Sequence, residues 1–209
     1  MKKMQTLTCK EFTFSKPTTA LRELLILSAI EENLSISQTV LADRAGIVSS
    51  MANNYIKDLV RRGLVSMEGE TNRDKTYALT DEGRAFKQQL AMWYSIESIR
   101  SYQEIRGRFA ARLRELADEG FRRIVLYGAA ETGEIVLAAA RRSPVEIVGV
   151  VDGDETKHRA SFGGLTVFPP SEILVFRPDA VLITSFAHRH EIHEAIRHMP
   201  SHGIAVRHL

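Results

Sequence analysis

The chain has very little cysteine and no long apolar run. Cys9 is its only cysteine, which excludes an intramolecular disulfide and favours a reducing compartment. No apolar stretch reaches the roughly 18 residues that a transmembrane helix needs. The N-terminal segment MKKMQTLTCKEF lacks the apolar core of a secretory signal. These absences predict a cytoplasmic protein without a membrane span.

A strong charge of one sign is absent too. The 209 residues include 28 Lys and Arg against 26 Asp and Glu, a net charge of +2, so any DNA-binding charge must be local, on one helix and one loop. Catalytic patterns are also missing: there is no Tyr-x-x-x-Lys dyad and no recognisable Ser-His-Asp order. We therefore predict that the protein is not an enzyme and has no catalytic residue.

The first 83 residues follow a helical pattern and then a hairpin pattern. Apolar side chains in 20–32 have the spacing of an amphipathic helix, with Thr18 or Thr19 as its cap. Ser37 is expected to cap a short helix through Ala45, Gly46 to permit a sharp turn, and Ser49 or Ser50 to cap a helix that Gly63 ends. LVSMEGE and TYALT then predict two strands around the polar loop TNRDK.

The string GLVSMEGETNRDKTYALTDEGRAF resembles the wing and following helix of the MarR-like winged-helix regulators. The shared pattern is G-L-V, a wing, and Y-x-L-T-x-x-G, and the resemblance covers about residues 20–90. It implies that residues 1–83 form a winged helix-turn-helix domain that binds double-stranded DNA.

Side-chain chemistry in this domain also favours DNA contact. Asparagine pairs with adenine, and serine meets phosphate or base. Basic side chains, Arg62 among them, suit phosphates, and basic residues of the wing would reach the minor groove or a phosphate. We predict that Met51, Tyr55, Ile56, Leu59 and Val60 face the domain core. The predicted DNA-binding residues are Ser49, Ser50, Asn53, Asn54, Lys57, Arg61, Arg73 and Lys75. The alternative is a winged helix that docks proteins.

Residues 84–120 contain no proline and have apolar residues three and four apart, which predicts two helices broken near Gly107. DNA readers commonly bind as two-fold dimers. We therefore predict a homodimer in which the first part of this segment pairs, while the second part packs on a sheet.

The sequence from Arg122 to Asp154 predicts a strand, a glycine-containing turn, a helix and a second strand, followed by an acidic residue. The turn is G-A-A-E-T-G, from Gly128 to Gly133. Asp152 follows the second strand at about the distance of the ribose-binding acid in dinucleotide sites, and the helix N-terminus suits a phosphate. Ala130 replaces the middle glycine, and Glu131 would bring negative charge near that phosphate.

Further strands and short helices complete an α/β pattern, so the predicted fold class is α/β plus winged helix, with a Rossmann-like parallel-sheet domain over 121–209. The expected strand order is 3-2-1-4-5, with a ligand crevice at the strand carboxyl ends. The predicted ligand-binding residues are Gly128, Ala130, Glu131, Thr132, Gly133, Asp152, Thr184, Ser185 and His188.

The pattern Y-G-A, V-G-V-V-D and G-G-L-T-V, over about 122–185, resembles the nucleotide-binding domain of polysaccharide-biosynthesis dehydratases and epimerases. It is also similar to the CoA- or NAD-binding sensor domains of bacterial regulators. The order of the two domains resembles the Rex family of NADH-sensing repressors, although the chain stops at Leu209 without the helix that Rex dimers exchange. These resemblances imply NAD(H), a nucleotide sugar or CoA as the ligand and leave the choice open.

His190, His193 and Glu194 would share one helix face, but over a metal site we favour either contact between His188 and an anionic ligand or exposure of all these histidines to solvent. The leading hypothesis is a transcriptional regulator that binds DNA and senses a nucleotide-type ligand. The first alternative is a nucleotide-sugar-handling enzyme or an accessory protein of polysaccharide biosynthesis, in which the winged helix docks a protein. The second alternative is a C-terminal domain that serves as a ligand-free scaffold.

Overall fold

The computed structural model describes residues 17–69 and 75–209, so Cys9 and Arg73 lie outside the described residues. The described chain falls into two compact units, which divide between Arg100 and Ser101. The domain boundaries at residues 83 and 120 stay predictions. Among the helices that the structure describes, none is long and apolar enough to cross a membrane.

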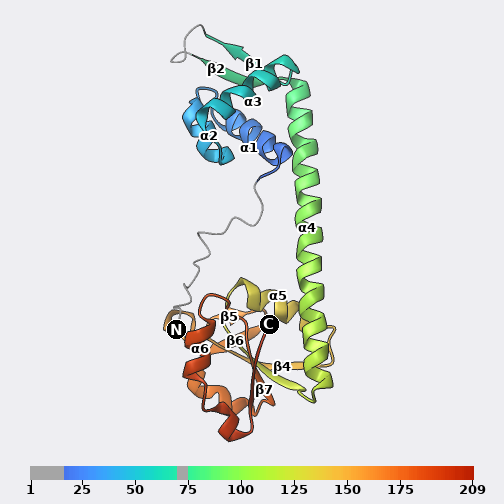
Figure 1. The fold of residues 1–209 in the computed structure, drawn as a ribbon, viewed down its shortest axis with the longest axis vertical. Coiled ribbons are helices and arrows are strands. Elements are labelled where there is room, and N and C mark those ends of the chain that lie inside the picture. Colours follow the sequence, from blue (N-terminus) through green and yellow to red (C-terminus); the bar gives the residue numbers. More distant parts are fainter. Residues whose placement is uncertain (1–16, 70–74) are drawn as a thin grey trace, which may run out of the picture. The chain divides into compact units, whose positions relative to one another are not determined.

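The N-terminal unit contains three helices followed by an antiparallel hairpin (Figure 1). The elements are α1 (Thr19–Glu32), α2 (Gln38–Ala45), α3 (Ser49–Arg61), β1 (Val65–Glu68) and β2 (Thr76–Leu79). Their apolar faces form one core, which includes Ile26, Leu41, Ile56 and Leu59.

Most of the predicted helix ends are confirmed. The hydroxyls of Thr18 and Ser37 accept hydrogen bonds from the first turns of α1 and α2, and Gly46 ends α2 at a φ of 63°. Gly63, at a φ of 72°, follows the end of α3 as predicted. The cap of α3 was predicted wrongly: Val48 is the N-cap, without a side-chain hydrogen bond, and Ser49 is already helical.

The motif Y-x-L-T-x-x-G closes this domain around the hairpin. Tyr77 and Leu79 are buried. The hydroxyl of Thr80 donates to the carbonyl of Gly63 at 2.7 Å and accepts from the amide of Gly83 at 2.9 Å. Gly83 lies directly against the main chain of Leu64, where a Cβ would come 1.9 Å from the carbonyl oxygen. Each residue that the motif specifies therefore has a structural reason to be there.

Arg62, which we expected to contact phosphate, is engaged within the domain. Its guanidinium donates to Glu23 at 2.7 Å and to Asp58 at 3.1 Å, and it lies 4.9 Å from the ring centroid of Phe86. The Glu23 side chain is 10% exposed. Hydrogen bonds from Arg62 and then Arg61 hold the pKa of Asp58 below its usual value. Arg62 thus neutralises a buried carboxylate.

Replacing Arg62 by alanine should therefore destabilise the N-terminal domain, because it leaves the Glu23 carboxylate buried without its partner. Removing one partner of a fully buried pair costs about 3–5 kcal/mol. Arg62 is itself 34% exposed, so we expect about 1–3 kcal/mol. Arg61→Ala is the matched control, since the Arg61 side chain is 79% exposed. Equal urea midpoints for the two variants would contradict this account.

A single helix, α4, runs from Asp81 to Asp118. The predicted break near Gly107 was wrong. One exposed glycine in a helix costs only about 1 kcal/mol, which the 38-residue helix accommodates without interruption. The α-helix assignment itself agrees with the apolar spacing of three and four in this segment.

The C-terminal unit is built on a six-stranded mixed sheet in the order β5-β6-β4-β3-β7-β8. The strands are β3 (Arg123–Tyr127), β4 (Glu146–Val151), β5 (Ser161–Phe162), β6 (Leu165–Phe168), β7 (Ala180–Ile183) and β8 (Ala205–His208). Strands β6, β4, β3, β7 and β8 pair in parallel, which confirms the predicted order 3-2-1-4-5. Sequence analysis missed β5, which pairs antiparallel with β6 at the edge.

Helices cover both faces of this sheet (Figure 1). Ile124 and Leu126 of β3 pack with the end of α4 and with α5 (Glu131–Ala140), whereas Val125 and Tyr127 pack with the 3-10 helix η2 (Pro170–Phe176) and α6 (Arg189–Ala195). Successive residues of a strand point to opposite faces, and both faces here are apolar. The central strands are therefore buried on both sides, as their near-continuous apolar sequences require.

Candidate functional site

One face of α3 is polar and exposed to solvent. Ser50, Asn54, Lys57 and Arg61 are all exposed, and their spacing of four, three and four residues places them along one side of the helix. Ala52, Ile56 and Leu59 occupy the buried side. The predicted DNA-binding residues of α3 thus include a continuous polar row. A row of hydrogen-bond donors and acceptors on a helix is the arrangement that reads base edges.

The remaining predicted residues of this surface differ in their surroundings. Ser49 is exposed, whereas Asn53 is half-buried and accepts a hydrogen bond from Gln38 at 3.4 Å. Gln38 also donates to the hydroxyl of Tyr77 at 3.4 Å, a link that sequence reasoning missed. Lys75 is half-exposed just before β2. Met51, expected in the core, is 40% exposed, because it lies on the side of α3 beside Asn54.

The C-terminal unit has a cavity of about 630 Å³ at the carboxyl ends of its parallel strands. Five of the predicted residues line it: Gly128, Ala130, Asp152, Ser185 and His188. The structure places four others outside its lining, namely Glu131, Thr132, Gly133 and Thr184. A cavity of this size at this edge of a parallel sheet is typical of small-molecule sites.

Two of the residues outside the lining, Thr184 and Gly133, shape the turn that borders the cavity. Thr184 is buried, and its hydroxyl donates to the carbonyls of Tyr127 and Gly128, at 3.0 and 2.8 Å. Gly128 has a φ of 122°, which favours glycine. A Cβ on Gly133 would come 2.5 Å from the Gly128 carbonyl oxygen. The two glycines of the motif therefore serve the backbone: one permits the turn, and the other lets α5 approach it.

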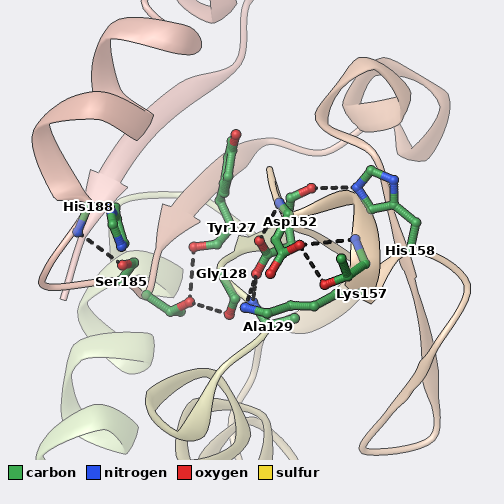
Figure 2. A network of polar contacts seen from close by, with 11 residues as sticks. Tyr127, Gly128, Ala129, Asp152, Lys157, His158, Ser185 and His188 are labelled. Carbon is green, nitrogen blue, oxygen red and sulfur yellow. Dashed lines mark hydrogen bonds and ion pairs between the residues drawn. The ribbon is translucent and has the colours of Figure 1, made fainter.

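Asp152 holds the turn in place (Figure 2). Its carboxylate accepts from the amide of Ala129 at 2.7 Å and from the amide of Asp154 at 2.9 Å. Lys157 forms an ion pair with the same carboxylate at 3.1 Å, while His158 contacts the Asp152 carbonyl at 2.8 Å. Asp152 was expected to accept from a ribose hydroxyl, yet both of its carboxylate oxygens already accept hydrogen bonds from the protein.

Several lining residues were not predicted. Tyr127, Gly153, Asp154 and Lys157 come from β3 and the loop after β4, and others come from the loop before α6 and from α6 itself. Burial, and then the charge of Asp152, raise the pKa of Tyr127. Hydrogen bonds from Thr156 lower the pKa of Asp154. The signal that could have found Lys157 is its place five residues after the strand-terminal acid, in a turn that folds back on that acid.

The opposite wall of the cavity comes from the loop after β7 and from α6. The Ser185 hydroxyl accepts from the amide of His188 at 3.2 Å, and the His188 imidazole pairs with Glu191 at 3.0 Å. Figure 2 shows Ser185 and His188 on one side of Gly128, and Lys157 on the other. The described residues contain no group of three histidine, cysteine or acidic side chains that could hold a metal ion. His193 instead stacks on His208, with ring centroids 5.6 Å apart.

Two family models match separate parts of the chain. Residues 24–98 match a winged helix-turn-helix family, and residues 120–204 match the family of C2185-like N-terminal domains. The N-terminal region is therefore a winged helix-turn-helix, and a mixed, mostly parallel sheet follows it. No curated protein matches the chain.

Solved structures similar to this chain each correspond to part of it. The MarR family protein Rv2887 of Mycobacterium tuberculosis is 22% identical, with a TM-score of 0.35 over 38% of this chain and 62% of its own. The PcaV transcriptional regulator of Streptomyces coelicolor is 21% identical, with a TM-score of 0.37 over 50% and 80%. UDP-D-quinovosamine 4-dehydrogenase of Vibrio fischeri is 19% identical, with a TM-score of 0.38 over 42% and 77%. The chain thus spans about three fifths of the length of Rv2887.

Proposed function

We propose that the protein is a transcriptional regulator that binds double-stranded DNA through α3 and the wing and senses a nucleotide-type ligand in its C-terminal domain. The exposed polar row on α3 is the observation that carries this proposal. Ser50 and Asn54 offer hydrogen bonds to base edges, and Lys57 and Arg61 offer charge to phosphates. Ser49, Asn53, Arg73 and Lys75 complete the proposed surface.

The experiment is a mobility shift with genomic fragments that flank the gene, comparing wild type with the double variant Asn54→Ala/Lys57→Ala. We expect the variant to lose at least about tenfold in affinity, since one base contact is worth about 1–3 kcal/mol. Losing the phosphate contact of Lys57 should also reduce the salt slope. Gln89→Ala, an exposed and uncharged change on α4, is the control. If the double variant binds DNA with the same affinity as wild type at every salt concentration, α3 does not contact the DNA as proposed.

We propose the cavity beside Gly128 as the sensing site, with NAD(H), a nucleotide sugar or CoA as candidate ligands. A ligand that binds one conformation of the protein better than another shifts its DNA-competent population. Support comes from the position of the cavity at the carboxyl ends of β3, β4 and β7 and from its lining of backbone, hydroxyl and charged groups. Native mass spectrometry of the purified protein would detect a retained ligand.

We further propose that α4 pairs with α4 of a second copy. Seven large apolar side chains between residues 92 and 105 are 40–56% exposed. Met92, Ile96, Ile99 and Tyr102 among them are spaced four, three and three residues apart, which places them along one side of α4, the seam of the proposed pair. Glu97, Ser101 and Glu104 lie on the opposite side of the helix. Exposed apolar patches of this kind mark interaction sites, and a two-fold dimer suits palindromic DNA.

Ile99→Glu should convert the dimer to a monomer, because each subunit would bury an unpaired carboxylate at the seam. Light scattering coupled to gel filtration at micromolar concentration gives the mass directly. Ser101→Glu, which introduces the same carboxylate on the opposite, exposed side of α4, is the control and should remain dimeric. A monomeric wild-type protein, or a dimeric Ile99→Glu variant, would rule out pairing through this seam.

A further inference from the structure

The basic side chains that line the C-terminal cavity are paired with acidic ones. Lys157 and His188 are the basic residues of the lining, and Asp152, Asp154 and Glu191 are the acidic ones. Each basic residue is paired with an acid, Lys157 with Asp152 at 3.1 Å and His188 with Glu191 at 3.0 Å. Among the described residues that line the cavity, the basic side chains that could pair with an anionic group of a ligand are therefore already paired.

The N-terminus of α5 is poorly suited to a phosphate in this protein. Its first turn carries Glu131 and Glu134, both exposed, and negative charge there repels an anion that the helix dipole would otherwise attract. Ala130 is the N-cap of α5 and one of the residues that line the cavity. In dinucleotide sites a glycine at this position lets the pyrophosphate reach the backbone. Both features oppose phosphate binding at this helix end.

Lys157 can pair with an anionic ligand while the buried Asp152 carboxylate keeps its other hydrogen-bond donors. Its side chain is 38% exposed, whereas that of Asp152 is 12% exposed. If Lys157 turns toward a ligand, Asp152 still accepts from the amides of Ala129 and Asp154, at 2.7 and 2.9 Å. Each oxygen of the Asp152 carboxylate thus keeps one backbone donor. The Lys157 ammonium has three N–H donors, which it can direct at the ligand.

His188 is less suited to this role. Its side chain is 68% exposed and pairs with an 80% exposed Glu191, so water screens its interaction with an anion more strongly. The loop after β4 therefore offers the better charge partner. Lys157 lines the cavity together with Gly153 and Asp154, which belong to the same loop after β4.

We infer that the ligand is a phosphorylated molecule whose phosphate or diphosphate pairs with Lys157, on the β4 side of the cavity, and not with the N-terminus of α5. This inference rests on the proposed sensing function. It assigns Lys157 as an anion-binding residue and leaves Asp152 as the residue that positions the Gly128 turn.

The test is isothermal titration of the full-length protein with UDP-glucose, NADH and coenzyme A as separate probes. Lys157→Gln should weaken binding of the recognised probe by about 10- to 100-fold, the range for hydrogen bonds to charged groups, and should flatten its salt dependence. Lys157→Arg should retain most of the affinity. Glu131→Gln should change it less than about threefold, and thermal melts of the unliganded variants should match wild type.

A tighter complex with Glu131→Gln together with an unchanged one with Lys157→Gln would place the phosphate at α5 and overturn the inference. Failure of all three probes to bind the folded wild type would overturn the sensing proposal and this inference with it. Binding that is insensitive to both variants would leave the sensing proposal standing and refute only the role of Lys157.

Discussion

Replacing Gly83 by alanine is expected to destabilise the N-terminal domain by about 3 kcal/mol. The added Cβ would lie 1.9 Å from the carbonyl oxygen of Leu64, and no contact of that length is tolerated. Relief would require α4 to move away from the main chain between α3 and β1. Such a shift would break the hydrogen bonds from Thr80 to Gly63 and from Gly83 to Thr80. Overpacking against backbone is expensive because no side chain can rotate away.

Gly107→Ala is the matched control, because it makes the same chemical change in the same helix. A Cβ on Gly107 meets no atom within 4 Å, so the gain in helix propensity of about 0.5–1 kcal/mol should dominate. Calorimetry with hydrogen exchange of peptides from residues 19–79 would separate the two outcomes. A Gly83→Ala protein whose N-terminal exchange matches wild type would show that the Leu64 contact is not as close as described.

Asp152→Ala should release the turn at Gly128 and abolish ligand binding in the C-terminal cavity. The substitution removes the acceptor of the amides of Ala129 and Asp154 and the partner of Lys157. Ala129 is buried, so its amide would be left without a hydrogen bond. An unsatisfied buried donor costs about 1–3 kcal/mol, and with the weaker loss at Asp154 we expect about 2–3 kcal/mol in total.

Asp154→Ala is the control for this prediction. The Asp154 carboxylate is exposed and, among the described residues, accepts hydrogen bonds from Thr156, two residues along the chain, so its removal should leave the Gly128 turn intact. Chemical denaturation followed by circular dichroism would measure both variants, and exchange of the Ala129 amide would report on the turn itself. Similar protection of Ala129 in Asp152→Ala and wild type would refute a positioning role for Asp152.

The sequence predicted the parts of the fold that depend on local chemistry. Thr18, Ser37, Gly46 and Gly63 each mark a helix end because capping involves residues within one turn of one another. The order of the five parallel strands followed from short right-handed connections. The hairpin of β1 and β2 was signalled by two short apolar segments around a polar loop. For the C-terminal domain, the predicted parallel sheet was found as a mixed, mostly parallel sheet.

Two kinds of feature were missed: those where local signals within a helix conflict, and those that depend on contacts between distant residues. Gly107 predicted a break in the helix, but α4 continues through it because the other residues of this segment favour a helix. Met51 has an apolar side chain on the margin of α3, where the helical pattern alone did not decide between core and solvent. Thr184 and Asp152 were read as ligand contacts because of their positions at strand ends. The structure shows that both hydrogen-bond the Gly128 turn, which sequence spacing could not reveal.

The contacts of Asp152 have a consequence for how binding would be transmitted. Because its carboxylate fixes the Gly128 turn before any ligand arrives, ordering that turn adds little entropic cost to association. Because the Gly128 turn is already ordered, its conformation should change little when a ligand binds. The wall formed by Ser185, His188 and α6 is held at the surface by an exposed pair. We therefore expect ligand binding to move α6 first, while the Gly128 turn keeps its position.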